Sequence, residues 1–399
     1  MPFASGSISF RRFAVVGGDH PDAVTQDLLD RLSTHALRDR EFGVPEEVEY
    51  GWSGGRHILD GQFSFEHNVF GDALHFALRI DTNKVPGELK RAYTFIEEEA
   101  VAATNPSGFI SKNQKRDVKQ SVGRKIEDDL RSGQFRRSKL VQMLWDMPTQ
   151  TLYCSAGGTT LEKLLEIFER TFDLKLVPLS AGSMALRMLE KGHRRAYEDF
   201  RPTRFVMGPE GEGAFPDYPW VAKGPEPKDF LGNEFLLWLW HGLEQHDGRI
   251  ELKSSEHDVT LMIDRSLDLD CAYGATGKDA LRGTGPAQMP EARDALRTGK
   301  LPRKAGLILD SNGQQFTFTF NAETLGCNGT KLPDVEDAES SRVLFEERIT
   351  LLRDLCETLD GLFEAFLGVR ANSSWEHQTS ALRKWIVQNA KSMAVHAVA

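Results

Sequence analysis

The residues best placed to act together chemically lie in one basic segment, 111–140. Between positions 111 and 139, ten lysines and arginines stand against four acidic residues, a net charge of +6 in a chain of 399 residues whose formal charge is -10. Clustered positive charge attracts a polyanion, because the local field depends on how charges are grouped. The segment is therefore the leading candidate for a nucleic-acid surface. Its candidate contact residues are Lys112, Lys115, Arg116, Lys119, Arg124, Arg131, Phe135, Arg136, Arg137 and Lys139.

Apolar residues recur at every fourth position of this segment, which predicts a helix with one apolar seam. The seam residues are Val118, Val122, Ile126 and Leu130. At about 100° per residue, Arg116, Arg124 and Arg131 fall on the side away from the seam, with two acidic residues among them. We expect Ser132-Gly133 to end the helix and a strand to follow at 140–145.

The same residues could instead form a solvated helix face whose charges make ordinary surface pairs. Two features favour a polyanion. The excess of lysine and arginine continues beyond the helix through Arg136, Arg137 and Lys139, and Phe135 beside them could stack against a base or seal a contact. Lysine and arginine without base-reading Asn or Gln pairs bind phosphate with little readout, so we expect sequence-independent binding.

The other candidate groups complete no catalytic or cofactor motif. The glycine-rich stretches 15–20 and 156–160 lack the GxxxxGK[ST] and GxGxxG patterns, and the second is explained as a turn followed by a helix cap. His241, His246 and His257 lack the i, i+4 histidine pair of HExxH. We therefore predict no cofactor, no metal and no catalytic residue.

A group of acidic residues leaves one enzymatic alternative. Asp258, Asp264, Asp268 and Asp270 could hold Mg²⁺ for phosphodiester cleavage, as in a nuclease. They alternate with apolar residues, however, as the solvated face of an amphipathic strand does. We favour the strand face and keep the Mg²⁺-dependent nuclease as the alternative function.

Composition indicates an ordinary globular protein with 40% hydrophobic residues. No run of about eighteen apolar residues is present, and the N-terminus lacks the apolar region of a secretory signal, so we expect a cytoplasmic protein without a membrane partner. The four cysteines lie far apart without a CxxC pair, which indicates reduced core residues.

The pattern of elements predicts an α+β fold with antiparallel sheets, packed helices and a helical C-terminal part. We expect an N-terminal α+β unit at 1–191, a linker or exposed insertion at 192–229, a second α+β unit at 230–330 and helices at 331–399. In the first unit we expect strands at 7–16, 49–52, 63–70, 74–80, 152–154 and 174–179, and helices at 21–37, 84–104 and 161–172. Thr159 and Glu162 fit a capping box for the last of these helices.

The second unit is expected to open with a buried helix at 230–240, because that stretch is apolar on nearly all sides. We expect strands at 249–253, 258–264, 303–310 and 315–321, a loop at 273–288 and a short helix at 289–297. In the C-terminal part, an apolar seam predicts a helix that packs against another helix. We favour a partner at 375–393 of the same chain over a second subunit. The seam residues are Phe345, Leu352, Leu355, Leu359, Leu362 and Phe366.

With these features in order, the chain resembles the longer branch of the RdgC family of recombination-associated DNA-binding proteins, from about Phe10 to Ile386. The resemblance is carried by Tyr50-Gly51-Trp52, Leu78-Arg79 with Lys84-Val85-Pro86, the basic helix with Phe135 after it, Trp145-Asp146, Leu176-Val177-Pro178-Leu179, Gly232 to Trp240 and Gly299-Lys300-Leu301-Pro302. Where many members have Pro-Arg-Ala-Phe, this chain has Ser132-Gly133-Gln134-Phe135, followed by two arginines.

The resemblance implies an α+β protein that dimerises into a closed ring around double-stranded DNA, without sequence preference. It also implies association with the nucleoid and competition with recombinase for DNA. An older family label, putative exonuclease, has no catalytic motif behind it in this sequence. Phe135 could serve as a DNA contact, a subunit contact or a core residue.

Overall fold

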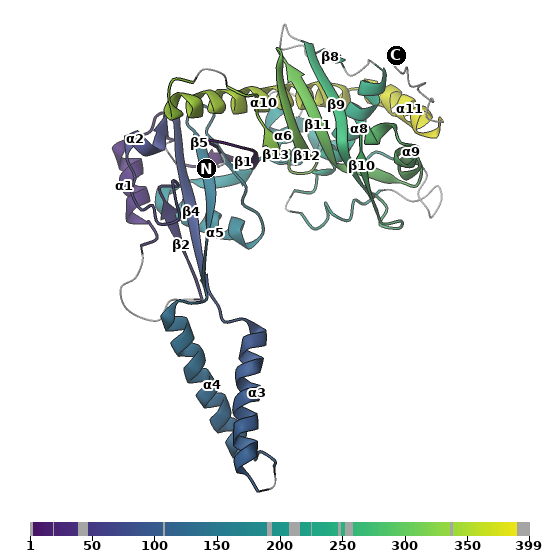
Figure 1. Cartoon of the computed structure of the whole chain (residues 1–399). Helices are drawn as coiled ribbons and strands as arrows, with labels where there is room; N and C mark the ends of the chain where they lie inside the picture. Colours follow the sequence, from purple (N-terminus) through teal and green to yellow (C-terminus); the bar gives the residue numbers. More distant parts are fainter. Residues whose placement is uncertain are drawn as a thin grey trace, which may run out of the picture. The chain divides into compact units, whose positions relative to one another are not determined.

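The computed structural model describes residues 3–18, 20–38, 47–106, 108–189, 194–206, 216–224, 226–245, 249–251, 258–335 and 338–388. The chain forms two compact units, whose elements are labelled in Figure 1. Unit 1 comprises Met1–Val16, Thr149–Ser155 and Leu176–Ala399, and unit 2 comprises Gly17–Pro148 and Ala156–Lys175. The expected parts, 1–191, 192–229, 230–330 and 331–399, follow one another along the chain, whereas the observed chain leaves unit 1 twice and returns to it twice.

Unit 2 contains a small antiparallel sheet in which β4 is central, with β5 on one side and β2 on the other. A short strand, β3, also pairs with β4. The elements are α1 (Gln26–Thr34), β2 (Val48–Ser53), α2 (Phe65–Asn68), β3 (Val69–Phe70), β4 (Ala73–Asn83), α3 (Gly87–Thr104), α4 (Lys112–Ser132), β5 (Arg136–Asp146) and α5 (Thr159–Phe172).

Aromatic side chains from the sheet and from α5 form the core of unit 2. Trp52 of β2 lies edge-on to Phe76 of β4, with ring centroids 5.2 Å apart, and Trp145 of β5 lies 5.3 Å from Phe172 of α5. The indole N–H of Trp52 donates to Oγ1 of Thr171 at 2.8 Å, so its one polar atom is satisfied inside the core. The face of the sheet that carries these rings is thus held against α5.

Unit 1 is built on a larger sheet with the strand order β10-β9-β11-β12-β13-β1-β6, in which these neighbours pair antiparallel; β8 pairs with β9 and β7 with β1. Its strands are β1 (Ile8–Val16), β6 (Thr151–Cys154), β7 (Lys175–Pro178), β8 (Arg249–Glu251), β9 (Asp258–Cys271), β10 (Lys278–Gly283), β11 (Lys300–Ser311), β12 (Gln314–Asn321) and β13 (Gly326–Lys331). Its helices are α6 (Ala181–Leu189), α7 (Arg194–Asp199), α8 (Phe230–Gln245), the 3₁₀ turn η1 (Pro286–Gln288), α9 (Pro290–Arg297), α10 (Ser341–Arg370) and α11 (Ser374–Val387).

The core of unit 1 joins the sheet to α8 and α10. Phe235 of the buried helix α8 lies 6.1 Å from Phe320 of β12 and 5.2 Å from Phe363 of α10, measured between ring centroids. All six expected seam residues of α10 are buried. The helices that α10 contacts, α6, α8 and α11, belong to the same chain, as expected for the seam. Of the expected partner helix at 375–393, residues 389–393 lie outside the described part.

Two local expectations in unit 2 are wrong. The strand expected at 63–70 is instead the short helix α2 followed by β3, because Ser64 caps the helix by accepting from the N–H of His67 and the buried Asn68 amide bonds to the carbonyls of Gly54 and His75. The capping box at Thr159 does not form. Helix α5 already begins at Thr159, after Gly158 in a left-handed conformation with φ 54°, without a side-chain cap.

Two expectations in unit 1 also differ from the structure. The described parts of 192–229 include α7 and the buried aromatic residues Tyr197, Phe200, Phe205 and Tyr218, so they belong to the core and are not an exposed insertion. Residues 190–193, 207–215 and 225 lie outside the described part. Within 273–288, expected as a loop, β10 pairs along β9 from Lys278 to Gly283, which converts polar and glycine residues into an edge strand.

The four cysteines are buried thiols, as expected for core residues. Over the described ranges, no helix combines the length and the apolar content that crossing a membrane requires.

Two glycines of α8, one packed closely and one not, test how tightly this helix packs. A Cβ on Gly232 would lie 1.9 Å from the carbonyl oxygen of Ala322, whereas a Cβ on Gly242 would meet nothing within 4 Å. We expect Gly232→Ala to lower the free energy of unfolding by about 1–3 kcal/mol through overpacking. Gly242→Ala should raise it by up to about 1 kcal/mol, since alanine favours the helix. Denaturant unfolding of both variants measures the difference, and equal effects would contradict the packing described.

Candidate nucleic-acid interface

The basic segment lies in a helical hairpin that unit 2 extends from the ends of two paired strands. Strands β4 and β5 pair in register from Ala73↔Asp146 to Asn83↔Arg136, and the chain between them forms α3 and α4. Figure 1 shows the two helices side by side beyond the ends of these strands, joined by a short turn. The side-chain amide of Asn83 donates to the carbonyl of Leu130 at 2.9 Å, which ties the C-terminal end of α4 to the end of β4.

Local signals in the sequence define both ends of α4. Ser111 caps the helix by accepting from the N–H of Gln114, and the Gln114 side chain accepts from the N–H of Ser111, which completes a capping box. Gly133 ends the helix in the left-handed region, with φ 73°. The expected helix over the basic segment is thus confirmed.

The contact between α3 and α4 is thin and partly polar. Of the expected apolar seam, Val118 and Val122 are buried while the other two residues are half-buried, and α3 contributes no buried residue. The hydroxyl of Tyr93 donates to Asp129 at 2.9 Å, and Nζ of Lys125 lies 4.1 Å from the centroid of the Tyr93 ring. The hairpin therefore depends on a few specific contacts more than on a broad core.

Most basic residues of the hairpin lie on α4 and at the start of β5, whereas α3 carries four glutamates against two cations. Nine of the ten lysines and arginines between 111 and 139 are exposed, Arg136 being half-buried, and none of these nine forms an ion pair with another described residue. Glu127 precedes Arg131 by four positions, a spacing that suits a helical ion pair, yet the pair is not formed. The nine residues are Lys112, Lys115, Arg116, Lys119, Arg124, Lys125, Arg131, Arg137 and Lys139.

The three basic residues after the helix, expected as one group, are divided between the two faces of β5. Side chains alternate along a strand, so Arg137 and Lys139 share one face, opposite Thr82 and Ile80, whereas Arg136 points to the other. On that other face Arg136 bonds to the buried carboxylate of Asp81.

Asp81 is the centre of a buried charge cluster at the base of the hairpin. Arg79 on the same strand also forms an ion pair with it, at 2.8 Å. Burial alone would raise the pKa of Asp81, but hydrogen bonds from Arg79, Ser138 and Arg136 hold that pKa below its ordinary value. Arg136 thus has a structural partner, and Arg137 and Lys139 remain the accessible cations of β5.

Phe135 lies half-buried in the turn between α4 and β5, directly before Arg136 in the chain. Its side chain is therefore neither a full core residue nor freely exposed. A contact of this ring with DNA or with a second subunit stays a prediction.

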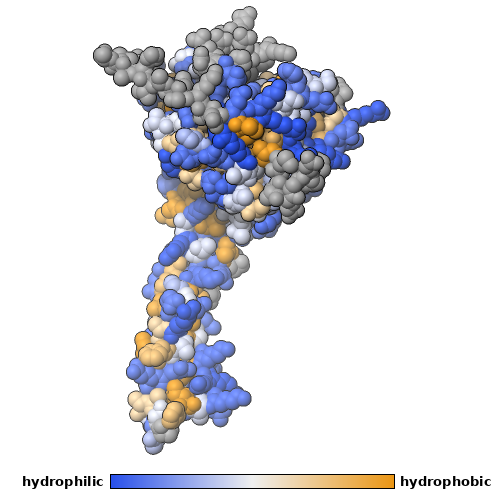
Figure 2. All heavy atoms as spheres, turned by 90° about the vertical axis from the view of Figure 1, so that its right-hand side faces the viewer, coloured by the Kyte–Doolittle hydropathy of each residue, from blue (hydrophilic) through white to orange (hydrophobic). Residues whose placement is uncertain are grey.

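Apolar surface on the same hairpin was not predicted from the sequence. Phe95 and Ile96 of α3 are 66% and 59% exposed, and Phe109 in the turn between the helices is 82% exposed. Figure 2 shows apolar residues scattered among hydrophilic ones along this part of the molecule. The adjacent pair Phe95-Ile96, directly followed by three glutamates, was the signal that could have revealed it, since one helix face cannot bury both neighbours against α4.

The acidic residues that carry the nuclease alternative lie on β9, where cations neutralise them. Asp268 pairs with Arg282 at 2.5 Å, and Asp270 lies 3.3 Å from both Lys278 and Arg303. The side chain of Asp258 is outside the described part, as are His246 and His257; His241 lies edge-on to Trp385. Within the described ranges, no three His, Cys, Asp or Glu side chains gather as a metal ion would require.

No protein-family model and no curated protein matches this chain.

Two neighbouring arginines of β5 provide a matched test of this geometry. Replacing Arg136 by Gln removes a partner of buried Asp81, so we expect the free energy of unfolding to fall by about 1–3 kcal/mol. Arg137→Gln removes an exposed charge of the same kind without a partner and should leave stability nearly unchanged. Chemical denaturation of both variants is the measurement, and comparable losses would show that Arg136 is not structurally tied to Asp81.

Proposed function

We propose that this protein binds double-stranded DNA through its phosphates, without sequence preference, and that it acts in recombination or replication as a ring-shaped homodimer that limits access of recombinase to DNA. The carrying observation is the row of exposed lysines and arginines on α4 and β5 that have no ion-pair partner among the described residues. Association with the nucleoid would follow from such binding.

The dimensions of α4 support a contact along a duplex. Its 21 residues make a helix about 30 Å long, close to the roughly 34 Å of one duplex turn. Cations spread over that length can contact phosphates along the DNA backbone. Each phosphate that they neutralise releases condensed counterions. Lysine and arginine contacts of this kind position a protein on DNA without reading bases.

The dimer is proposed to form through the apolar surface of the hairpin. Phe95 and Ile96 are adjacent, large and exposed, and Phe109 on the same hairpin is also exposed, as expected of residues that another molecule covers. The long apolar seam of α10 is already buried within the chain, so it does not serve for association. A second copy is the proposed occupant, since one hairpin cannot enclose a duplex and the RdgC resemblance implies a ring of two subunits.

DNA binding is tested by removing charge from one face of α4. Neutralising Arg116, Arg124 and Arg131 with glutamine should weaken binding to unrelated duplexes about equally. The slope of log Kobs against log salt concentration should fall by about one for each phosphate that the variant no longer neutralises. Fluorescence anisotropy over a salt series measures both quantities.

The control for this experiment is a triple variant of exposed cations outside the hairpin, Arg195, Lys223 and Lys304, each replaced by glutamine. It should bind as the unaltered protein does. Binding that is indifferent to salt, or a loss confined to one DNA sequence, would contradict the proposal.

The nuclease alternative is tested by incubating linear DNA with the protein and Mg²⁺. We expect the DNA to stay intact. Cleavage that Asp264→Ala abolishes would favour the nuclease.

Dimerisation is tested by making the hairpin polar. The triple variant Phe95→Gln, Ile96→Gln and Phe109→Gln should raise the dimer dissociation constant by about tenfold or more, because exposed aromatic anchors dominate such interfaces. Sedimentation velocity over a concentration series is the measurement. Leu59→Gln, at a residue 65% exposed outside the hairpin, is the matched control. A monomeric unaltered protein, or an unchanged triple variant, would contradict the assignment.

A further inference from the structure

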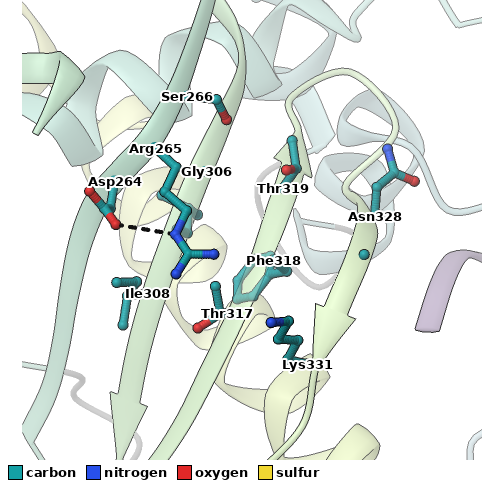
Figure 3. A pocket seen from close by; sticks show the side chains of 12 residues that line it. Asp264, Arg265, Ser266, Gly306, Ile308, Thr317, Phe318, Thr319, Asn328 and Lys331 are labelled. Carbon is teal, nitrogen blue, oxygen red and sulfur yellow. Dashed lines mark ion pairs between the residues drawn. The ribbon is translucent and has the colours of Figure 1, made fainter. Parts of the chain in front are cut away.

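The sheet of unit 1 has a small hollow on its face, formed by β9, β11, β12 and β13 and lined by both polar and apolar residues. Its volume is about 140 Å³, well below the few hundred Å³ of sites for drug-sized molecules. Figure 3 shows Arg265 and Lys331 extending toward this hollow from different strands, with Thr317 between them. The space suits a single compact polar group.

A bulge in β9 creates the hollow. The pairing of β9 with β11 shifts between Ala305↔Leu267 and Leu307↔Ile263, so the three residues 264–266 stand opposite Gly306 alone. A Cβ on Gly306 would lie 2.2 Å from the carbonyl oxygen of Asp264, so only glycine accommodates this approach. Arg265 at the centre of the bulge has φ 63°, a conformation that costs a residue with a side chain about 1 kcal/mol or more.

Six of the twelve residues that line the hollow carry side-chain donors, and the apolar ones are Leu307, Ile308 and Phe318. Lys331 forms no ion pair with any described residue, and the nearest contact between Arg265 and Asp264 is a loose 3.6 Å. The side chains of Ser266, Thr317 and Asn328 also make no hydrogen bond within the described ranges. Two cations and several neutral donors thus surround a space of ionic size, with one carboxylate at its edge.

We propose that this hollow is a binding site for a phosphoryl group. Arg265 and Lys331 supply charge-assisted hydrogen bonds to its oxygens, and the hydroxyl of Thr317 and the amide of Asn328 supply neutral ones. A tetrahedral phosphoryl group can accept from more of these donors at once than a planar carboxylate does. The bulge places the guanidinium of Arg265 where it can reach this group. The site uses none of the hairpin residues, so it stands whether or not the hairpin binds DNA.

Two substitutions that should leave the protein folded test the site. Arg265→Gly removes the guanidinium and suits φ 63°, so this variant should be as stable as the unaltered protein or more stable. Lys331→Gln removes the second cation and keeps most of the side-chain length. Lys304→Gln, at an exposed cation of β11 outside the hollow, is the control.

Inorganic phosphate is the probe, with sodium chloride and acetate at matched ionic strength as references. Phosphate should raise the melting temperature of the unaltered protein and the Lys304 variant above the references. The dissociation constant for phosphate, from the same titration or from ³¹P line broadening, should rise about tenfold in each hollow variant, as expected when one charge-assisted bond is removed. No phosphate-specific shift, an equal shift with acetate, or an unchanged constant in both hollow variants would overturn the site.

A DNA titration distinguishes the sources of the phosphoryl group. If the group is a DNA phosphodiester, the hollow variants also bind DNA more weakly, and their slope of log Kobs against log salt concentration is smaller. If it is a free phosphate or the phosphate of a small molecule, the hollow variants lose phosphate binding while their DNA binding matches that of the Lys304 variant. Because the phosphate titration is read without DNA, failure of the hairpin proposal leaves this outcome unaffected.

Discussion

Strand β4 pairs without interruption with β5 over its whole length, and the candidate interface depends on this ladder. One end of the ladder lies in the aromatic core against α5, where Trp145 contacts Phe168 and Phe172. The other end carries the buried Arg79–Asp81–Arg136 cluster and continues directly into α3 and α4. Most helical stability in proteins comes from tertiary packing, and the contact between these two helices is thin. The position of the basic helix is therefore set by hydrophobic burial some distance from it.

The cations of α4 differ from those of the paired strands β9 and β10 in their ion pairing. On β9 and β10, acidic and basic residues neutralise one another in pairs such as Asp268 with Arg282. On α4, like charges face solvent without partners although acidic residues lie on the same helix. Mutual repulsion of that kind opposes folding, and an anionic ligand relieves it. A net-acidic protein can thus present one strongly basic element, because the acidic excess lies on other elements.

Apolar surface is also used differently in the two units. The thirty-residue helix α10 buries its seam against helices of the same unit, so its heptad spacing reflects packing within one chain. The hairpin exposes Phe95, Ile96 and Phe109, whereas its buried apolar residues are Val118 and Val122 of α4. Left-handed backbone follows no such division, because it occurs at Arg265 on the sheet face and also at the buried residues Tyr218 and Leu325.

Local sequence determined the elements whose signals are complete within a few residues. The ends of α4 follow from Ser111, Gln114 and Gly133, and the buried face of α10 follows from its apolar spacing. Where tertiary contacts oppose the local preference of the chain, the secondary structure predicted from local signals was wrong. The buried Asn68 holds a helical turn in place of a strand, and pairing with β9 makes a strand from the polar stretch at 278–283.

The candidate site divides in the same way. Charge clustering and helical phase identified the basic residues of α4 from sequence, since both depend on near neighbours. Only the tertiary structure decided that Arg136 is held by Asp81, a residue 55 positions away, while Arg137 is left accessible. The same holds for the hollow, where pairing across strands brings Arg265 and Lys331 together. Spacing along a chain predicts which face a side chain takes, whereas its partner across the fold depends on the register of strands that are distant in sequence.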